Sequence, residues 1–176
     1  GDLLGETLEI THQLDKSLDD LLEQERQQRV EITELKERFR NLKLKMNDNS
    51  NLYAESFITL EMRTKEVEHN FSVFEEWMFA SNFEKAKELS EENYDLVVAL
   101  DEHLDRIPPL YEQAKGVIPG MLEQVSKSYQ IAKVEDVFVD HLEIAKNIGL
   151  ITEVLKEDLV RISQCELDDA EESLIE

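Results

Sequence analysis

A repeat of apolar residues at alternating steps of three and four constrains the fold of this chain more than any other feature. Near the N-terminus the repeat occupies ten positions: Leu14, Leu18, Leu21, Glu25, Gln28, Ile32, Leu35, Phe39, Leu42 and Met46. Such steps place side chains on one face of an α-helix, and polar layers such as Glu25 and Gln28 set register or partner orientation in coiled coils. We predict a helix over residues 3–46, about 66 Å long at roughly 1.5 Å per residue, which makes a rod.

Later segments carry the same spacing and predict helices over residues 52–80, 83–116, 119–133 and 137–172. The seam of the second helix consists of Tyr53, Phe57, Leu60, Thr64, Val67, Phe71, Phe74 and Met78. The next seam consists of Ala86, Ser90, Asn93, Val97, Leu100, Leu104, Ile107, Tyr111, Ala114 and Ile118. The last consists of Ile144, Ile148, Ile151, Leu155, Ile162 and Cys165. The aromatic residues of the second helix would also suit a ligand pocket, but we favour a packed seam.

Turn-forming residues separate these segments. Residues 47–51 are Asn-Asp-Asn-Ser-Asn and favour a reversal of the chain between two helices. The alternative is one continuous helix, because the heptad spacing before and after these residues nearly stays in phase. We reject a calcium loop there, because its sixth position is not Gly and its twelfth is Thr59 instead of Glu. Ser81-Asn82 marks the next turn, and Pro108-Pro109 predicts a kink because proline removes a backbone donor.

The fold class follows from these segments and from composition. The chain of 176 residues has only 5 Gly and 3 Pro, and no segment shows the period-two alternation of a strand. We therefore predict an all-α protein: one domain over residues 1–176, built as an elongated antiparallel helical bundle. No apolar run is long enough to span a membrane, so we expect a soluble chain. Because it opens Gly-Asp, we expect a piece of a longer protein.

Net charge excludes several partner classes. The formal charge is −22, with 41 acidic residues against 19 Lys and Arg, which disfavours nucleic acid and anionic lipid. The basic residues between 26 and 45 could suggest a membrane-curving bundle, but Glu residues are interleaved with them. Residues 134–176 hold 13 acidic and 3 basic residues, a net of −10. A solvated face is the favoured interpretation there, and an acidic docking surface is the alternative.

Catalytic and metal-binding patterns are missing from the sequence. His12, His69, His103 and His141 stand apart from one another, and no Cys/His pair has metal-ligand spacing. The single Cys, Cys165, lies on a seam and is expected to be a buried, inert thiol in a reducing compartment. We predict no catalytic, cofactor-binding or metal residue, no small-molecule ligand, and no enzymatic activity.

Short motifs in order along residues 25–138 resemble one family. They are E-x3-R-x-E-I-x2-L-x-E-R-F over residues 25–39, Leu60-Glu61 with Val67, Phe71 and Phe74, Asn82-Phe83-x2-Ala86, and Ile107-Pro108-x-Leu110 with Pro119 and Tyr129. This pattern resembles the septation ring formation regulator EzrA of low-GC Gram-positive bacteria. Ser81 and Ser128 stand where that family has Gly. The family's Gln-Asn-Arg patch has no match, so no functional residue is carried over.

The resemblance implies spectrin-like triple-helical repeats in a cytoplasmic rod, with flanking helices shared between repeats. It also implies a parent protein anchored by an N-terminal transmembrane helix at the division septum. Its partners would be the tubulin-like division protein FtsZ, whose ring assembly it restrains, and other divisome proteins that it scaffolds. The alternative is a spectrin-like coiled-coil spacer with no direct partner of its own.

Overall fold

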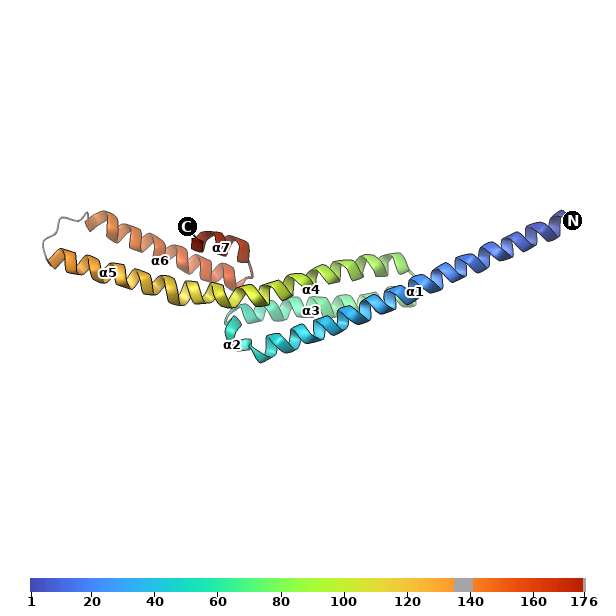
Figure 1. Ribbon diagram of the computed structural model, residues 1–176, viewed down its shortest axis with the longest axis horizontal. Helices are drawn as coiled ribbons and strands as arrows, with labels where there is room; N and C mark the ends of the chain where they lie inside the picture. Colours follow the sequence, from blue (N-terminus) through green and yellow to red (C-terminus); the bar gives the residue numbers. More distant parts are fainter. Residues whose placement is uncertain (135–140, 176) are drawn as a thin grey trace. The chain divides into compact units, whose positions relative to one another are not determined.

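The computed structural model describes residues 1–134 and 141–175, and within these ranges every regular element is a helix (Figure 1). In chain order the elements are α1 (Asp2–Asp48), α2 (Ser50–Tyr53), α3 (Ser56–Phe79), α4 (Phe83–Glu112), the π-helix η1 (Gln113–Val117), α5 (Ile118–Val134), α6 (His141–Ser163) and α7 (Leu167–Ile175). The all-α fold class predicted from the sequence is confirmed.

The chain divides into two compact units. The first comprises Gly1–Leu44 with Thr64–Ala99, and the second comprises Lys45–Arg63 with Leu100–Glu176. The boundaries fall inside α1, α3 and α4. The organisation of residues 1–176 as one spectrin-like repeat stays a prediction.

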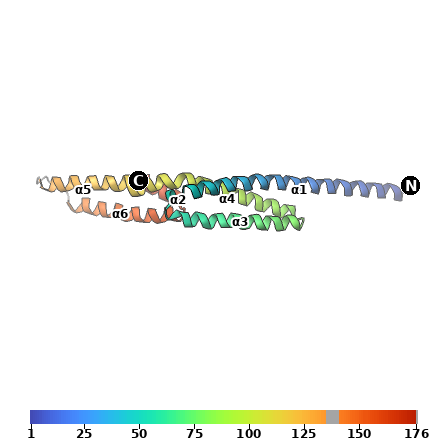
Figure 2. The same ribbon diagram turned by 90° about the horizontal axis from the view of Figure 1, so that it is seen from below.

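In the first unit, segments of α1, α3 and α4 lie side by side, and α3 runs antiparallel to α1 (Figures 1 and 2). Ion pairs fix this direction, because Arg29 pairs with Glu75 while Lys43, later in α1, pairs with Glu68, earlier in α3. The core of this unit is formed by the seam residues Ile32, Leu35, Phe39, Leu42, Val67, Phe71, Phe74, Met78, Ala86 and Val97.

A buried polar layer crosses the core of the first unit. Asn93 is 1% exposed, and its Nδ2 donates to the Val67 carbonyl oxygen at 3.3 Å. Its Oδ1 accepts from Asn70 Nδ2 at 3.2 Å. A buried amide that finds these partners costs little and favours one register of α4 against α3.

The turn between α3 and α4 lies at Ser81-Asn82. Ser81 has φ of 55°, a left-handed conformation, and Asn82 N–H donates to the Trp77 carbonyl while Ser81 N–H donates to that of Met78. This pair of bonds is a Schellman motif, formed here without the usual glycine. Asn82 Oδ1 then accepts from Lys85 N–H and caps the start of α4.

The second unit begins with a chain reversal between α1 and α3. Asn49 Nδ2 donates to the Lys45 carbonyl and closes α1, and the short α2 leads to Ser56, which is 0% exposed. The Ser56 hydroxyl donates to the Ile162 carbonyl oxygen at 2.7 Å and lies 3.0 Å from Tyr111 Oη. Thr59 donates likewise to the Ser163 carbonyl. Hydroxyls at the start of α3 therefore satisfy carbonyls at the end of α6.

The prolines do not break α4. The helix continues through Pro108-Pro109 to Glu112, and the irregularity follows as the π-helix η1. Ile107, Leu110 and Tyr111 are all buried. Packing on both sides of the prolines thus holds the helix together despite the lost donors.

The predicted helix over residues 137–172 is two helices in the structure, and its first four residues lie outside the described ranges. α6 ends at Ser163, where Cys165 has φ of 60° and Glu166 N–H donates to the Arg161 carbonyl. This second Schellman-type end costs backbone strain at a non-glycine residue. Burial of Leu167 and Ala170 in α7 offsets that cost.

Candidate interaction surfaces

The four histidines are divided between the two units, with His12 and His69 in the first and His103 and His141 in the second. His12 and His69 are exposed, His103 is half-buried, and the side chain of His141 lies outside the described part. Among the described residues, no three His, Cys, Asp or Glu side chains gather in a way that could hold a metal ion.

Cys165 lies in a buried position, with 5% of its surface exposed. Burial raises the pKa of its thiol, with the nearby Arg63 opposing that shift. A protonated, covered thiol is a poor nucleophile, so this residue packs as a small apolar side chain.

The basic residues in the second half of α1 are engaged by acids of the bundle. Arg29 Nη1 lies 2.7 Å from Glu75 Oε2, and Lys36 Nζ lies 2.8 Å from Glu75 Oε1. The ammonium group of Lys36, aided by Arg29, lowers the pKa of Glu75. Lys45 Nζ lies 2.7 Å from Asp105 Oδ1, which raises the pKa of that lysine. Because these cations have acidic partners on neighbouring helices, this stretch does not present the unopposed basic face that a membrane surface would attract.

His103 occupies a cationic environment in the second unit. Its Nδ1 lies 3.0 Å from Arg63 Nη1, so the neutral ring accepts a hydrogen bond from the guanidinium. Desolvation, Arg63 and Arg106 lower the pKa of His103, while Glu102 and Asp168 oppose them. Arg106 in turn donates to Asp168 at 2.8 Å and contacts Glu171, joining α4 to α7. Protonation of His103 would place three cations together at this contact.

The chain is expected to lose stability on mild acidification through His103. Because the pKa of His103 in the folded protein lies below the ordinary value for histidine, the unfolded chain takes up this proton first as the pH falls through about 6.5. The contribution of the neutral His103 ring to the free energy of unfolding is therefore fully present above that pH and is lost as the pH falls below it. Urea unfolding at pH 7.5 and 5.5 should show this loss in the wild type and a smaller one in His103→Gln. His69→Gln, at an exposed position, should keep the wild-type loss; an equal loss in all three proteins would contradict the assignment.

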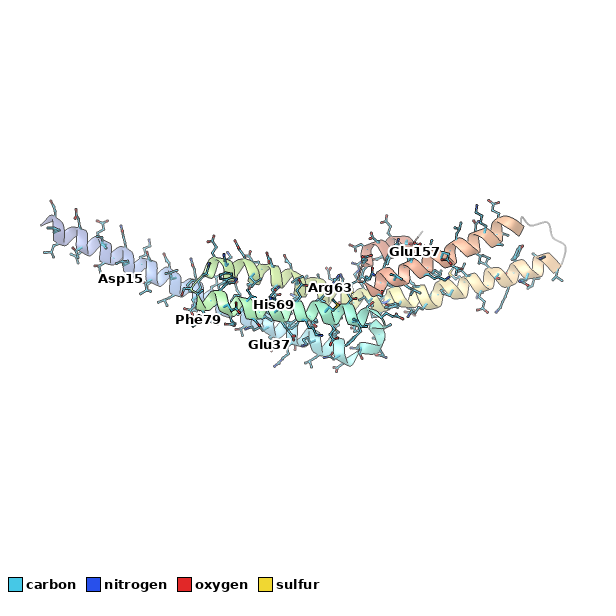
Figure 3. All side chains as sticks on the ribbon, turned by 180° about the vertical axis from the view of Figure 1, so that it is seen from behind. Asp15, Glu37, Arg63, His69, Phe79 and Glu157 are labelled. Carbon is cyan, nitrogen blue, oxygen red and sulfur yellow. The ribbon has the colours of Figure 1, made fainter. Side chains whose placement is uncertain are left out.

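The first half of α1 presents an uncovered apolar face. Eight large apolar side chains between residues 3 and 22 are 47–82% exposed. They are Leu3, Leu4, Leu8, Ile10, Leu14, Leu18, Leu21 and Leu22. At 3.6 residues per turn, all eight lie on one side of the helix, and we call this side the α1 apolar face. Among the described residues of the first unit, no other helix runs beside this half of α1 (Figures 1 and 2), on which Figure 3 labels Asp15.

Such a face favours association with another surface. Full burial of one Leu or Ile side chain stabilises by about 1.5–3 kcal/mol, and contiguous exposed apolar surface is typical of protein-binding sites. The sequence predicted Leu14, Leu18 and Leu21 as seam positions but did not show that the seam would be uncovered there. It also missed Leu3, Leu4, Leu8 and Ile10, although Leu4, Leu8, Leu14 and Leu18 fall on one side by spacing alone.

No helix in the described ranges is both long and apolar enough to cross a bilayer.

Comparison with known proteins identifies a family that the chain matches. The family described as "Septation ring formation regulator, EzrA" matches residues 1–176. Septation ring formation regulator EzrA of Geobacillus sp. (strain WCH70) is 26% identical over 157 residues, which covers 89% of this chain and 28% of the relative. The proteins of the same name from Bacillus subtilis (strain 168) and Streptococcus suis (strain 98HAH33) are 24% and 25% identical, over 81% and 89% of this chain and 25% and 27% of their own lengths. The chain thus spans about three tenths or less of these relatives. No solved structure matches it.

Proposed function

The chain belongs to the EzrA family of septation ring formation regulators, and from that premise we propose that it is a non-enzymatic, protein-binding module of a cell-division regulator. In this proposal the module binds FtsZ, restrains assembly of its ring and scaffolds other divisome proteins. It acts on the cytoplasmic side of the cell membrane at the septum, within a parent protein anchored by an N-terminal transmembrane helix. A spectrin-like repeat with shared flanking helices is the architecture that we propose for it.

The α1 apolar face is the observation that carries this proposal. A helix whose apolar side is uncovered over some twenty residues gains free energy by packing against further helices. Seven acidic residues and one basic residue lie between positions 2 and 24, so the surroundings of the face are strongly negative. A second copy would bring the same charge, which disfavours self-association and favours a different polypeptide.

Co-sedimentation with polymerising FtsZ from a Gram-positive host tests the proposal. We expect the chain to pellet with the polymer, or to reduce the amount of polymer, and we expect this effect to weaken in a salt series from low to high ionic strength. Leu14→Glu/Leu18→Glu should reduce the effect by about tenfold, since two charges on the α1 apolar face oppose its burial.

A matched control separates this face from a general loss of solubility. Ile58 and Met62 are 67% and 66% exposed, lie one turn apart on α3 and are remote in sequence from the α1 apolar face. Ile58→Glu/Met62→Glu should therefore behave as wild type. Absence of any FtsZ effect at low salt would instead favour the alternative of a spacer with no direct partner.

A further inference from the structure

A groove between α1 and α4 of the first unit is distinct from the α1 apolar face. Two hollows follow one another along these helices, with volumes of about 490 Å³ and about 470 Å³. Residues 24–38 of α1 and 83–95 of α4 line them. Lower numbers on α1 accompany lower numbers on α4, so the two helices run parallel here. The lined stretch of α1 is about 21 Å long at roughly 1.5 Å per residue.

Acidic residues lie on both walls of this groove, together with the cations Arg38 on α1 and Lys87 on α4. Glu31 and Glu34 project from α1, and Glu91 and Asp95 project from α4. Glu91 pairs with Lys87 at 3.8 Å along its own helix, but neither Glu34 nor Asp95 has an ion-pair partner among the described residues. The contact between α1 and α3 is different, because Arg29 and Lys36 meet Glu75 there. In the hollow that these four carboxylates line, Arg38 is the one cation among the lining residues, so the excess of negative charge would attract a cationic ligand.

Buried polar groups in the groove also point to a ligand with hydrogen-bond donors. Gln28 is 5% exposed, lines one hollow, and its Oε1 lacks a hydrogen-bond partner within the described chain. Ser90 is 6% exposed and lines the other hollow, where a serine hydroxyl can accept as well as donate a hydrogen bond. A buried acceptor without a partner is destabilising, and a donor from a bound molecule would remove that cost.

An aromatic ring beside these carboxylates already holds a guanidinium. The Arg38 guanidinium carbon lies 5.6 Å from the ring centroid of Tyr94, and 49% of that tyrosine is exposed. The exposed remainder of the ring offers a surface on which a second cation or an aliphatic Lys or Arg stem would pack.

We propose that the α1–α4 groove binds a cationic peptide segment of a partner protein. At least two Lys or Arg side chains of the segment would lie between the carboxylates of Glu31 and Glu34 and those of Glu91 and Asp95. Donor groups of the segment would meet Gln28 Oε1 and the Ser90 hydroxyl. A peptide fits better than a metal ion, because among the described residues no cluster has metal-binding geometry. This assignment goes beyond the proposed function and stands whether or not the partner is FtsZ.

Fluorescence anisotropy with a defined probe tests the assignment on the whole chain. The probe is a fluorescein-labelled peptide of alternating Arg and Ala, and its uncharged counterpart carries citrulline in place of Arg. We expect saturable one-to-one binding of the Arg peptide and none of the citrulline peptide. Glu34→Gln/Asp95→Asn should weaken binding by about tenfold, because two charge-assisted contacts are lost.

The matched control changes the same residue types outside the groove. Glu9→Gln/Asp15→Asn alters net charge equally on the exposed half of α1, where Figure 3 labels Asp15, and should weaken binding less than twofold. Gln28→Met removes the unmet acceptor and should reduce affinity severalfold without lowering the melting temperature. Equal weakening in the groove variant and the control would reduce the binding to general electrostatics and overturn the assignment. Stoichiometric Mg²⁺ binding in place of peptide binding, lost in Glu34→Gln/Asp95→Asn, would overturn it in favour of a cation site.

Discussion

Leu100→Asp is expected to unfold the protein or to lower its melting temperature by roughly 10 °C or more. Leu100 is 2% exposed on α4, where a carboxylate would be buried without a cationic partner. An uncompensated buried charge costs on the order of 3–5 kcal/mol, and for a chain of this size 1 kcal/mol corresponds to about 2–4 °C. Thermal unfolding followed by circular dichroism at the helical band measures the loss.

Leu14→Asp is the control for that substitution. Leu14 lies on the same kind of heptad seam but is 64% exposed, so its carboxylate would remain in water. Its melting temperature should stay within about 2 °C of wild type, since surface substitutions usually change stability by no more than about 0.5 kcal/mol. If both variants melted as wild type does, the buried core would have been assigned to the wrong residues.

Phe74→Ala is expected to destabilise the protein by about 3–5 kcal/mol. Phe74 is 1% exposed on the face of α3 that packs in the first unit, and truncation removes a large buried ring and leaves a cavity. The expected result is a lower urea midpoint with little change in the dependence on urea concentration, because the surface exposed on unfolding is almost the same.

Phe79→Ala makes the same chemical change five residues later on α3. Phe79 is 93% exposed at the end of the helix and points away from it (Figure 3). Its removal takes no apolar surface out of a core, so the unfolding free energy should stay within about 0.5 kcal/mol of wild type. A loss in Phe79→Ala comparable with that in Phe74→Ala would show that this turn is covered in solution.

The charged substitutions also separate stability from binding. Leu14→Asp lies on the α1 apolar face, so it should leave the fold intact while reducing association with a partner. Leu100→Asp should affect both, because the binding surface requires the folded bundle. Comparing melting temperature with co-sedimentation therefore distinguishes a damaged fold from a damaged interface.

Helical periodicity predicted much of the buried core. Side chains at steps of three and four share a face at 3.6 residues per turn, so the sequence placed Val67, Leu104 and Ile162 on seams, and all three are 0–2% exposed. It also marked Ser81-Asn82, because serine and asparagine satisfy backbone groups at helix ends. Family membership was likewise predicted from short motifs and is confirmed over residues 1–176.

Other features lay beyond such local rules. The end of α6 at Ser163 was missed because no Gly marks it, and burial of Leu167 in α7 offsets the strain of the left-handed Cys165. The bond from Ser56 to the Ile162 carbonyl joins residues 106 positions apart. No spacing rule connects them, since their meeting depends on how α6 packs in the second unit.

The sequence by itself determined that the chain is helical and which side of each helix is apolar, because both follow from propensity and period along one segment. Tertiary structure decided which of those apolar sides are covered. Leu35 and Leu14 occupy equivalent heptad positions, yet one is 5% and the other 64% exposed. The difference lies in whether other helices run alongside, and that depends on where the chain reverses. The α1 apolar face and the acidic α1–α4 groove exist for the same reason: periodicity chooses a helix face, and only packing determines what it meets.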